Sequence, residues 1–350
     1  MRSFEKLIRW MLILGIFILL VAPNLYAAQD LESRVEELER RVVDLERMVE
    51  ELRGSGPPFL GQGPSSPALN TPFFHEVRGA ISKNGLHFEV LPGPFFQHAS
   101  VPDVLELKKD SKAGKEGMLL LYFVDFSEVI SPSSEGISLA SSINGRVWSE
   151  KKKITLMGKL NRGAAVDPSV VELVDGRIRM YFFGSEIVEG DPAMASGNHK
   201  IYSAISEDGV HFQVEPGIRF QAPSITDPEV LRAGREWLMF LSEGTETLLA
   251  RSKDGLNFKL DRTFCLNIGG VPGAVELANG KVRIFACGQG GIVSALFTPG
   301  SDSPPVIEHG VCIDEAADPA CVRRLNGTYY LIFKTMMKKG KPGSEISGAE

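Results

Sequence analysis

The 350-residue chain lacks the features that mark several classes of protein. It has no CxxC pair, and the local spacings of its four cysteines do not match a zinc site. It has no long basic run and carries a net charge of −6, so no electrostatic footprint indicates nucleic-acid binding. The sequence leaves open whether the cysteines form disulfides or are buried free thiols; they are Cys265, Cys287, Cys312 and Cys321.

The most apolar run of the chain is short and lies at the N-terminus. Basic residues come first, apolar residues extend from Trp10 to about Pro23, and small residues follow at Ala27 and Ala28. This order predicts a secretory signal peptide over residues 1–28. The run is shorter than the roughly 18–20 residues of a spanning helix, although an uncleaved membrane anchor stays open. We expect an exported protein that is periplasmic, extracellular or tethered to the outer side of a membrane.

Residues 30–53 show a heptad pattern followed by a linker. Valine at position a and leucine at position d favour a parallel two-stranded coiled coil, and they recur at Leu31, Val35, Leu38, Val42, Leu45, Val49 and Leu52. A single amphipathic helix packed on the main domain is the alternative. We predict a weak homodimer through residues 31–53, because three heptads are marginal on their own. Residues 54–72, rich in Gly, Pro and Ser, predict a flexible linker, and residues 338–350 a disordered tail.

The remaining residues, 73–337, contain two repeated units. The first is S-x-[D/N]-G-x-x-[F/W], which predicts a hairpin with a positive-φ turn and an inward-facing aromatic residue. Its copies are Ser82–Phe88, Ser142–Trp148, Ser206–Phe212 and Ser252–Phe258, with a degenerate fifth near Gly300. The second unit is an inner strand, a turn and a more hydrophobic strand. It occurs five times, near Pro102, Asp167, Asp227, Val271 and Asp318.

The alternation of these units predicts an all-β fold, a five-bladed β-propeller with four strands in each blade. The chain begins with an outer hairpin, Glu76 to Val90, and ends with inner strands, Asp318 to Phe333, that lack one. We therefore expect the N-terminal hairpin to complete the last blade and close the ring.

Inner strands line the central channel of a propeller, so the residues that open them are expected to face an axial pocket. At these positions stand Asp103, Asp167, Asp227, Val271 and Asp318. Converging carboxylates suit general acid/base chemistry, because burial and mutual repulsion separate their pKa values. One carboxylate activates water while another holds a proton for the leaving group, which is how most glycosidases work.

The DPSVVELVDGRIRMYFFG segment, the PDV opening of the first blade and the five-blade count resemble glycoside hydrolase family 43 and its arabinanase- and invertase-like relatives. The resemblance covers the propeller only. It implies a secreted, inverting glycoside hydrolase with Asp103 as the general base and Asp167 as the residue that tunes the pKa of the acid. The family has Glu as the acid on the third blade, whereas this sequence has Asp227, which is one methylene shorter.

An architectural role for the Asp-Pro pairs is the alternative, because Asp caps turns and Pro suits the first residue of a strand. The S-x-[D/N]-G hairpins are predicted to be scaffold. His98 and Arg162, in the segments that lead into blades one and two, and Asp318 are candidate residues for binding a carbohydrate ligand. No cofactor is predicted, and an axial metal ion stays open. The alternative function is a non-catalytic glycan- or protein-binding propeller presented on a coiled-coil stalk.

Overall fold

The computed structural model describes residues 72–127, 136–158, 165–184, 198–301 and 303–337. The predicted signal peptide or anchor, the coiled coil, nearly all of the linker and the C-terminal tail lie outside these residues, and so do the dimer and the membrane association expected from them. The helix of the described part is the short 3₁₀ element η1 (Pro72–Phe74). No helix in these ranges is long and apolar enough to cross a membrane.

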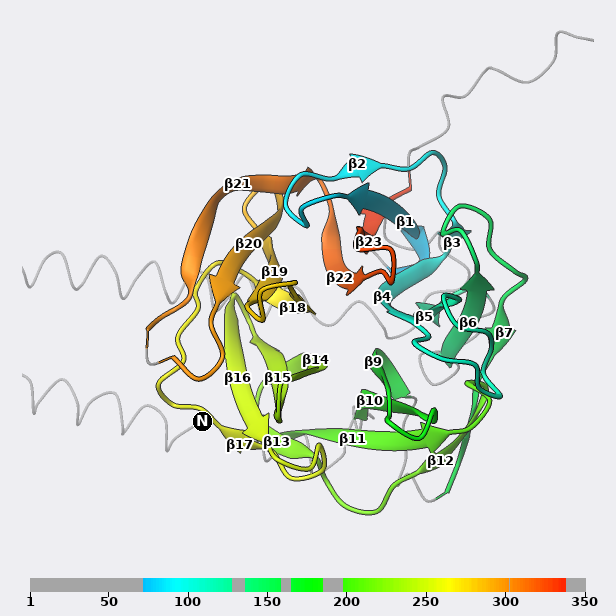
Figure 1. Cartoon of the computed structure of the whole chain (residues 1–350), viewed down its shortest axis with the longest axis horizontal. Helices are drawn as coiled ribbons and strands as arrows, with labels where there is room; N and C mark the ends of the chain where they lie inside the picture. The colour runs from blue at the N-terminus through cyan, green and yellow to red at the C-terminus, as the bar shows by residue number, and fades with distance from the viewer. Residues whose placement is uncertain (1–71, 128–135, 159–164, 185–197, 302, 338–350) are drawn as a thin grey trace, which may run out of the picture. The chain divides into compact units, whose positions relative to one another are not determined.

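The described residues form five sheets arranged as blades around a common axis (Figure 1). Blade one contains β4 (Ala99–Glu106), β5 (Leu119–Asp125), β6 (Gly136–Ser142) and β7 (Lys152–Lys153). Blade two contains β9 (Ala165–Glu172), β10 (Ile178–Gly184), β11 (Asn198–Ser206) and β12 (His211–Val214), with β8 (Thr155–Met157) and β13 (Phe220–Pro223) paired to its outer strands.

The other three blades follow the same order from the axis outwards. Blade three contains β14 (Ile225–Ala233), β15 (Glu236–Glu243), β16 (Glu246–Ser252) and β17 (Lys259–Leu260). Blade four contains β18 (Gly270–Glu276), β19 (Val282–Gly288), β20 (Gly291–Phe297) and β21 (Val306–Asp314). Blade five contains β22 (Ala317–Arg323), β23 (Tyr329–Met336), β1 (His75–Ser82) and β2 (Glu89–Val90), with β3 (Phe96–Gln97) beside β1. The predicted five-bladed propeller is confirmed.

The ring closes through the first and last strands of the propeller. Strand β1 pairs antiparallel with β23 along its whole length, from His75 opposite Met336 to Ser82 opposite Tyr329. The N-terminal hairpin therefore completes blade five, as the order of the repeats predicts. Closure of this kind joins the two ends of the propeller within one blade, so neither β1 nor β23 is left as an unpaired edge.

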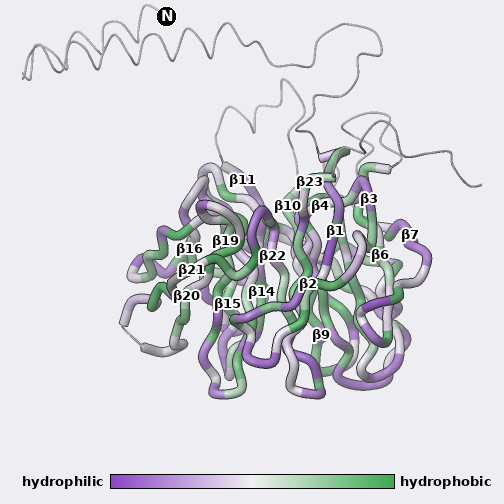
Figure 2. Tube along the Cα trace, turned by 90° about the horizontal axis from the view of Figure 1, so that it is seen from above, coloured by the Kyte–Doolittle hydropathy of each residue, from purple (hydrophilic) through white to green (hydrophobic). Residues whose placement is uncertain are grey.

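The core is divided into five hydrophobic clusters, one between each pair of neighbouring blades. The second strand of each blade supplies most of the large buried residues, because both of its faces are covered. Tyr122, Phe182, Phe240, Phe285 and Phe333 are each 0–1% exposed. In Figure 2 the hydrophobic colour follows the strands, and the hydrophilic colour gathers in turns at the lower edge. All four cysteines lie in the described part and are unpaired.

Four S-x-[D/N]-G hairpins, those of blades one, two, three and five, join their blade to the one before it. The Tyr122 hydroxyl donates to the Gly209 carbonyl at 2.9 Å, and Tyr181 donates to Gly255 at 2.7 Å. Tyr330 makes the same bond to Gly145. In blade five, Arg283 of blade four donates to the Asn84 carbonyl at 3.0 Å. The hairpins are therefore scaffold, as expected, and they lie away from the channel.

We expect Tyr122→Phe to lower the free energy of unfolding by about 1–2 kcal/mol, because it leaves the buried Gly209 carbonyl without its donor. Urea titration monitored by tryptophan fluorescence measures this. Tyr329→Phe is the matched control, since the Tyr329 hydroxyl makes no hydrogen bond within the described residues. An equal loss in both variants would show that the interblade bond contributes nothing.

Candidate active site

Every inner strand contains the same two-residue bulge, a residue X followed by proline. Pairing with the second strand skips these two residues in all five blades. Residue X is left-handed, with φ between 44° and 52°, at Val101, Asp167, Asp227, Val271 and Asp318. The five X-Pro pairs together line a small cavity of about 20 Å³. Residues X from five blades therefore meet at one end of the channel, which we call the axial cavity.

The expected position of Asp103 is wrong by two residues. The proline that follows each residue X aligns Val101-Pro102-Asp103 with Asp167-Pro168-Ser169. Asp103 thus corresponds to Ser169 and lies beyond the bulge, where it pairs with Tyr122. The carboxylates that line the axial cavity are those of Asp167, Asp227 and Asp318.

Asp103 instead belongs to a set of side chains that bridge neighbouring inner strands. Its carboxylate accepts hydrogen bonds from the backbone N–H of Val104 at 2.7 Å and from that of Val170 in blade two. Ser169 and Glu229 repeat this bridge, to Val230 at 2.8 Å and to Ala274 at 3.0 Å. Burial raises the pKa of Asp103 to about 7, against the opposing effect of these N–H donors.

Asp318 carries its negative charge in an ion pair. Its side chain is 4% exposed, and Oδ2 lies 2.8 Å from Lys334 Nζ. The same oxygen accepts the Ser100 hydroxyl and the Val101 backbone N–H, each at 3.3 Å. The Asp318 N–H donates to Cys287 Sγ at 3.1 Å. Blade five therefore places the Asp318 carboxylate, whose charge is balanced by Lys334, directly beside the bulge of blade one.

Asp167 and Asp227 differ from Asp318 in that their raised pKa values let them hold protons to higher pH than a free carboxyl group. Burial, followed by the negative charge of Asp318, raises the pKa of Asp227 to about 6, while the Thr226 hydroxyl donates to it at 2.6 Å. Burial and the charges of Asp227 and Asp318 raise the pKa of Asp167 well above its usual value. The cavity thus combines one ion-paired carboxylate with two that bind protons readily, an arrangement suited to acid/base chemistry.

Sequence reasoning missed Lys334 and His75, which lie in the paired strands that close the ring. The His75 imidazole is 2.9 Å from the Ser100 hydroxyl, through Nδ1. Burial and the positive charge of Lys334 lower the pKa of His75 to about 4. A lysine inside the apolar segment YYLIFKTM was the signal available in the sequence. The pairing of β1 with β23 is what brings both residues to the carboxylates.

The other candidate ligand residues do not reach this cavity. His98 bonds through Nδ1 to the Phe73 carbonyl at 2.6 Å, and its ring lies 4.0 Å from that of Phe73. It therefore holds η1 and does not line the axial cavity. Arg162 lies outside the described residues. Within the described ranges, no group of His, Cys, Asp and Glu side chains is arranged to hold a metal ion.

We expect Asp227→Asn to stabilise the fold at pH 8 by about 1–3 kcal/mol and to have less effect at pH 4.5. The folded pKa of about 6 lies above the unfolded value of 3.8, so the charged carboxylate destabilises the fold above pH 6. This penalty fades as the pH falls from 6 towards 3.8. Urea unfolding at the two pH values measures it.

Asp318→Asn is the matched control for this prediction. It should destabilise the fold at pH 8, because Lys334 would lose its partner in a site where its side chain is only 22% exposed. If Asp227→Asn were destabilising at pH 8 as well, Asp227 would not be the strained member of the cluster.

No protein-family model matches the chain, and no curated protein matches it by sequence. Solved structures resemble it. A GH32 β-fructofuranosidase from Bombyx mori has a TM-score of 0.51 at 16% identity, over 77% of this chain and 60% of the other. A sucrose-6-phosphate hydrolase from Lactobacillus gasseri has a TM-score of 0.52 at 13% identity, over 76% and 57%. An α-L-arabinanase from Penicillium chrysogenum has a TM-score of 0.48 at 14% identity, over 71% and 82%.

The two similarities with TM-scores above 0.5 confirm the predicted resemblance to five-bladed propeller glycosidases at the level of the fold. The chain spans about 60% of the length of the two hydrolases with the higher TM-scores.

Proposed function

We propose that the protein is an exported glycoside hydrolase that inverts the anomeric carbon in the axial cavity. The observation that carries this proposal is the pairing of unlike carboxylates from separate blades. Asp318 is held as an anion by Lys334, whereas the raised pKa of Asp227 lets it keep a proton in mildly acidic solution. Hydrolysis of a glycosidic bond needs one group of each kind.

In this proposal Asp318 takes the role that the resemblance gives to Asp103. Asp318 removes a proton from water as its oxygen attacks the anomeric carbon, and Asp227 donates its proton to the departing glycosidic oxygen. Solvent then returns both groups to their starting states. Asp167 accepts the backbone N–H of Asp227 and so helps to orient it, while burial and the negative charge of Asp318 keep the pKa of Asp227 high. Asp227 and Asp318 come from blades three and five, and inversion requires a base and an acid roughly 6.5–9.5 Å apart so that water fits between them.

The position of Asp318 supports this exchange of roles. In blade one the axial position is Val101, which has no acid/base group. The backbone N–H of Val101 donates to Asp318 Oδ2, so the blade-five carboxylate lies where a blade-one base would reach. Asp103 is engaged by the backbone of blade two and does not line the axial cavity.

The test is hydrolysis of a panel of aryl glycosides and polysaccharides by the full chain and three variants. We expect Asp318→Asn and Asp227→Asn to lower turnover by about 100-fold or more, because each removes a general acid or base. Turnover by the wild type should fall as the pH rises through about 6, where Asp227 loses its proton. Asp103→Asn is the control and should keep most of the turnover.

Loss of turnover in Asp103→Asn with turnover retained in Asp318→Asn would return the base to Asp103 and contradict this assignment. No turnover on any substrate by the wild type would favour the second candidate function.

That second candidate is a non-catalytic glycan-binding propeller. Two observations favour it: Val101 occupies the axial position of blade one, and Lys334 already neutralises Asp318. A coiled-coil dimer through residues 31–53 would then add avidity to weak sites. A glycan array decides between the two functions, because binding without turnover identifies this one. Turnover gained in Val101→Asp would mean that the site lacks only its base.

A further inference from the structure

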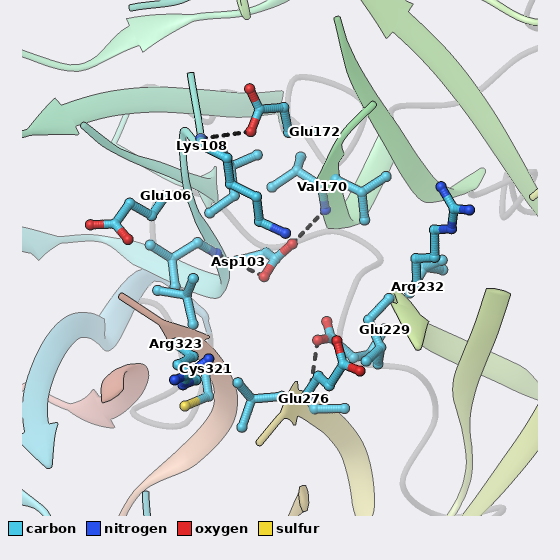
Figure 3. Close-up of a pocket in the computed structure, with 18 of the residues that line it drawn as sticks. Asp103, Glu106, Lys108, Val170, Glu172, Glu229, Arg232, Glu276, Cys321 and Arg323 are labelled. Carbon is cyan, nitrogen blue, oxygen red and sulfur yellow. Dashed lines mark hydrogen bonds between the residues drawn. The ribbon is translucent and has the colours of Figure 1, made fainter. Parts of the chain in front are cut away.

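The other end of the channel contains a much larger cavity, of about 870 Å³, which we call the wide cavity (Figure 3). It is lined by the C-terminal halves of the five inner strands and the turns that follow them. The X-Pro pairs separate it from the axial cavity, and Glu229 is the residue that both linings share. A volume of this size is typical of sites that enclose small ligands. The proposed hydrolysis does not use it, although Asp103, to which the resemblance gives the role of base, is part of its lining.

Three cations around the wide cavity are exposed and have no ion pair within the described residues: Lys108, Arg232 and Arg323. They come from blades one, three and five. Arg232 and Arg323 occupy the same position in their repeats, three residues beyond Glu229 and Ala320 respectively. Figure 3 shows both arginines and Lys108 on different sides of the cavity.

The other basic residues of the lining are already engaged. Lys109 Nζ donates to the Val174 carbonyl, and Arg324 forms an ion pair with Glu106 at 2.7 Å. This contrast separates cations with a structural partner from cations that are free to meet a ligand.

The acidic residues of the wide cavity compensate these free cations only in part. Glu106 is neutralised by Arg324, and Glu172 accepts the Lys108 backbone N–H at 2.7 Å. Deep in the cavity, burial raises the pKa of Asp103 to about 7 and that of Glu229 well above its usual value. Both therefore carry less negative charge near neutral pH. Glu276 is exposed in blade four, between the blades of the two arginines.

We propose that the wide cavity binds a small saccharide that carries a carboxylate or phosphate group. Arg232 and Arg323 offer the anionic group a planar guanidinium, which is well suited to it, from two sides of the cavity, and Lys108 adds charge from blade one. Carboxyl oxygens of the lining bind the hydroxyl groups. The negative charge of Glu276 repels the anionic group and weakens its binding, so removal of this charge strengthens binding.

The experiment is isothermal titration calorimetry of the full chain at pH 7.5 with four probes. They are a galacturonic acid trisaccharide, the neutral galactose trisaccharide, glucose 6-phosphate and inorganic phosphate. The galacturonic acid trisaccharide and glucose 6-phosphate distinguish carboxylate from phosphate as the preferred anionic group. The galactose trisaccharide tests whether binding needs a charge, and inorganic phosphate tests whether it needs sugar hydroxyls.

We expect at least one anionic sugar to bind about tenfold or more tightly than both the neutral sugar and inorganic phosphate. Arg232→Ala and Arg323→Ala should each weaken that binding by about tenfold, whereas Glu276→Gln should strengthen it several-fold. Asp318→Asn should leave it unchanged, which separates this site from the axial cavity whether or not hydrolysis is observed. Equal binding of the neutral sugar, no binding of either anionic sugar, or unchanged affinity in both arginine variants would overturn the proposal.

Discussion

The left-handed X-Pro bulge is the constraint on which the rest of this propeller depends. Five inner strands carry it, and it turns residue X out of the ladder towards the axis. A non-glycine residue in this conformation costs about 1–2 kcal/mol, less for Asp than for a β-branched residue such as Val101 or Val271. The cost is offset by bonds to residue X itself: Asp227 donates its N–H to Asp167, Val101 to Asp318, and Val271 to Ser242. These three bulges are thereby held by a side chain of the preceding blade.

The same bulge creates a second row of bonds one step further along the strand. There the backbone N–H groups of Val170, Val230 and Ala274 donate to side chains of the blade before them. The acceptors are Asp103, Ser169 and Glu229. A carboxylate in this row closes the ring around the channel, so its burial has an architectural cause. In the axial row, Asp167 and Asp318 each accept an interblade bond, whereas Asp227 accepts the Thr226 hydroxyl of its own blade. All three carboxylates still line the cavity, which leaves them available for chemistry.

Much of the fold could be predicted from the sequence, because the pattern of one blade recurs five times along the chain. The Asn-Gly and Asp-Gly hairpins and the surplus hairpin at the N-terminus are local signals, and they were sufficient to predict the closed ring. The site was predicted less well. In blade one the sequence is VPDV, with the proline before the aspartate, whereas in blade two it is VDPSV, with the proline after it. The alternation of side chains along a strand is interrupted at a bulge. Asp103 was therefore expected at the axial position, although it lies two residues beyond it. Lys334 and His75 reach the site only through pairing between strands at opposite ends of the propeller.

Closure of the ring and chemistry at the axis therefore depend on the same two strands. Strand β23 supplies Lys334, the cation that allows Asp318 to remain charged while buried, and β1 supplies His75, which Lys334 and burial keep neutral above pH 4. Three buried carboxylates with a single cation cannot all ionise at modest cost, so Asp167 and Asp227 take up protons. A fully compensated cluster would contain no proton donor. The incomplete neutralisation by Lys334 is thus what gives the site both an anion and an acid.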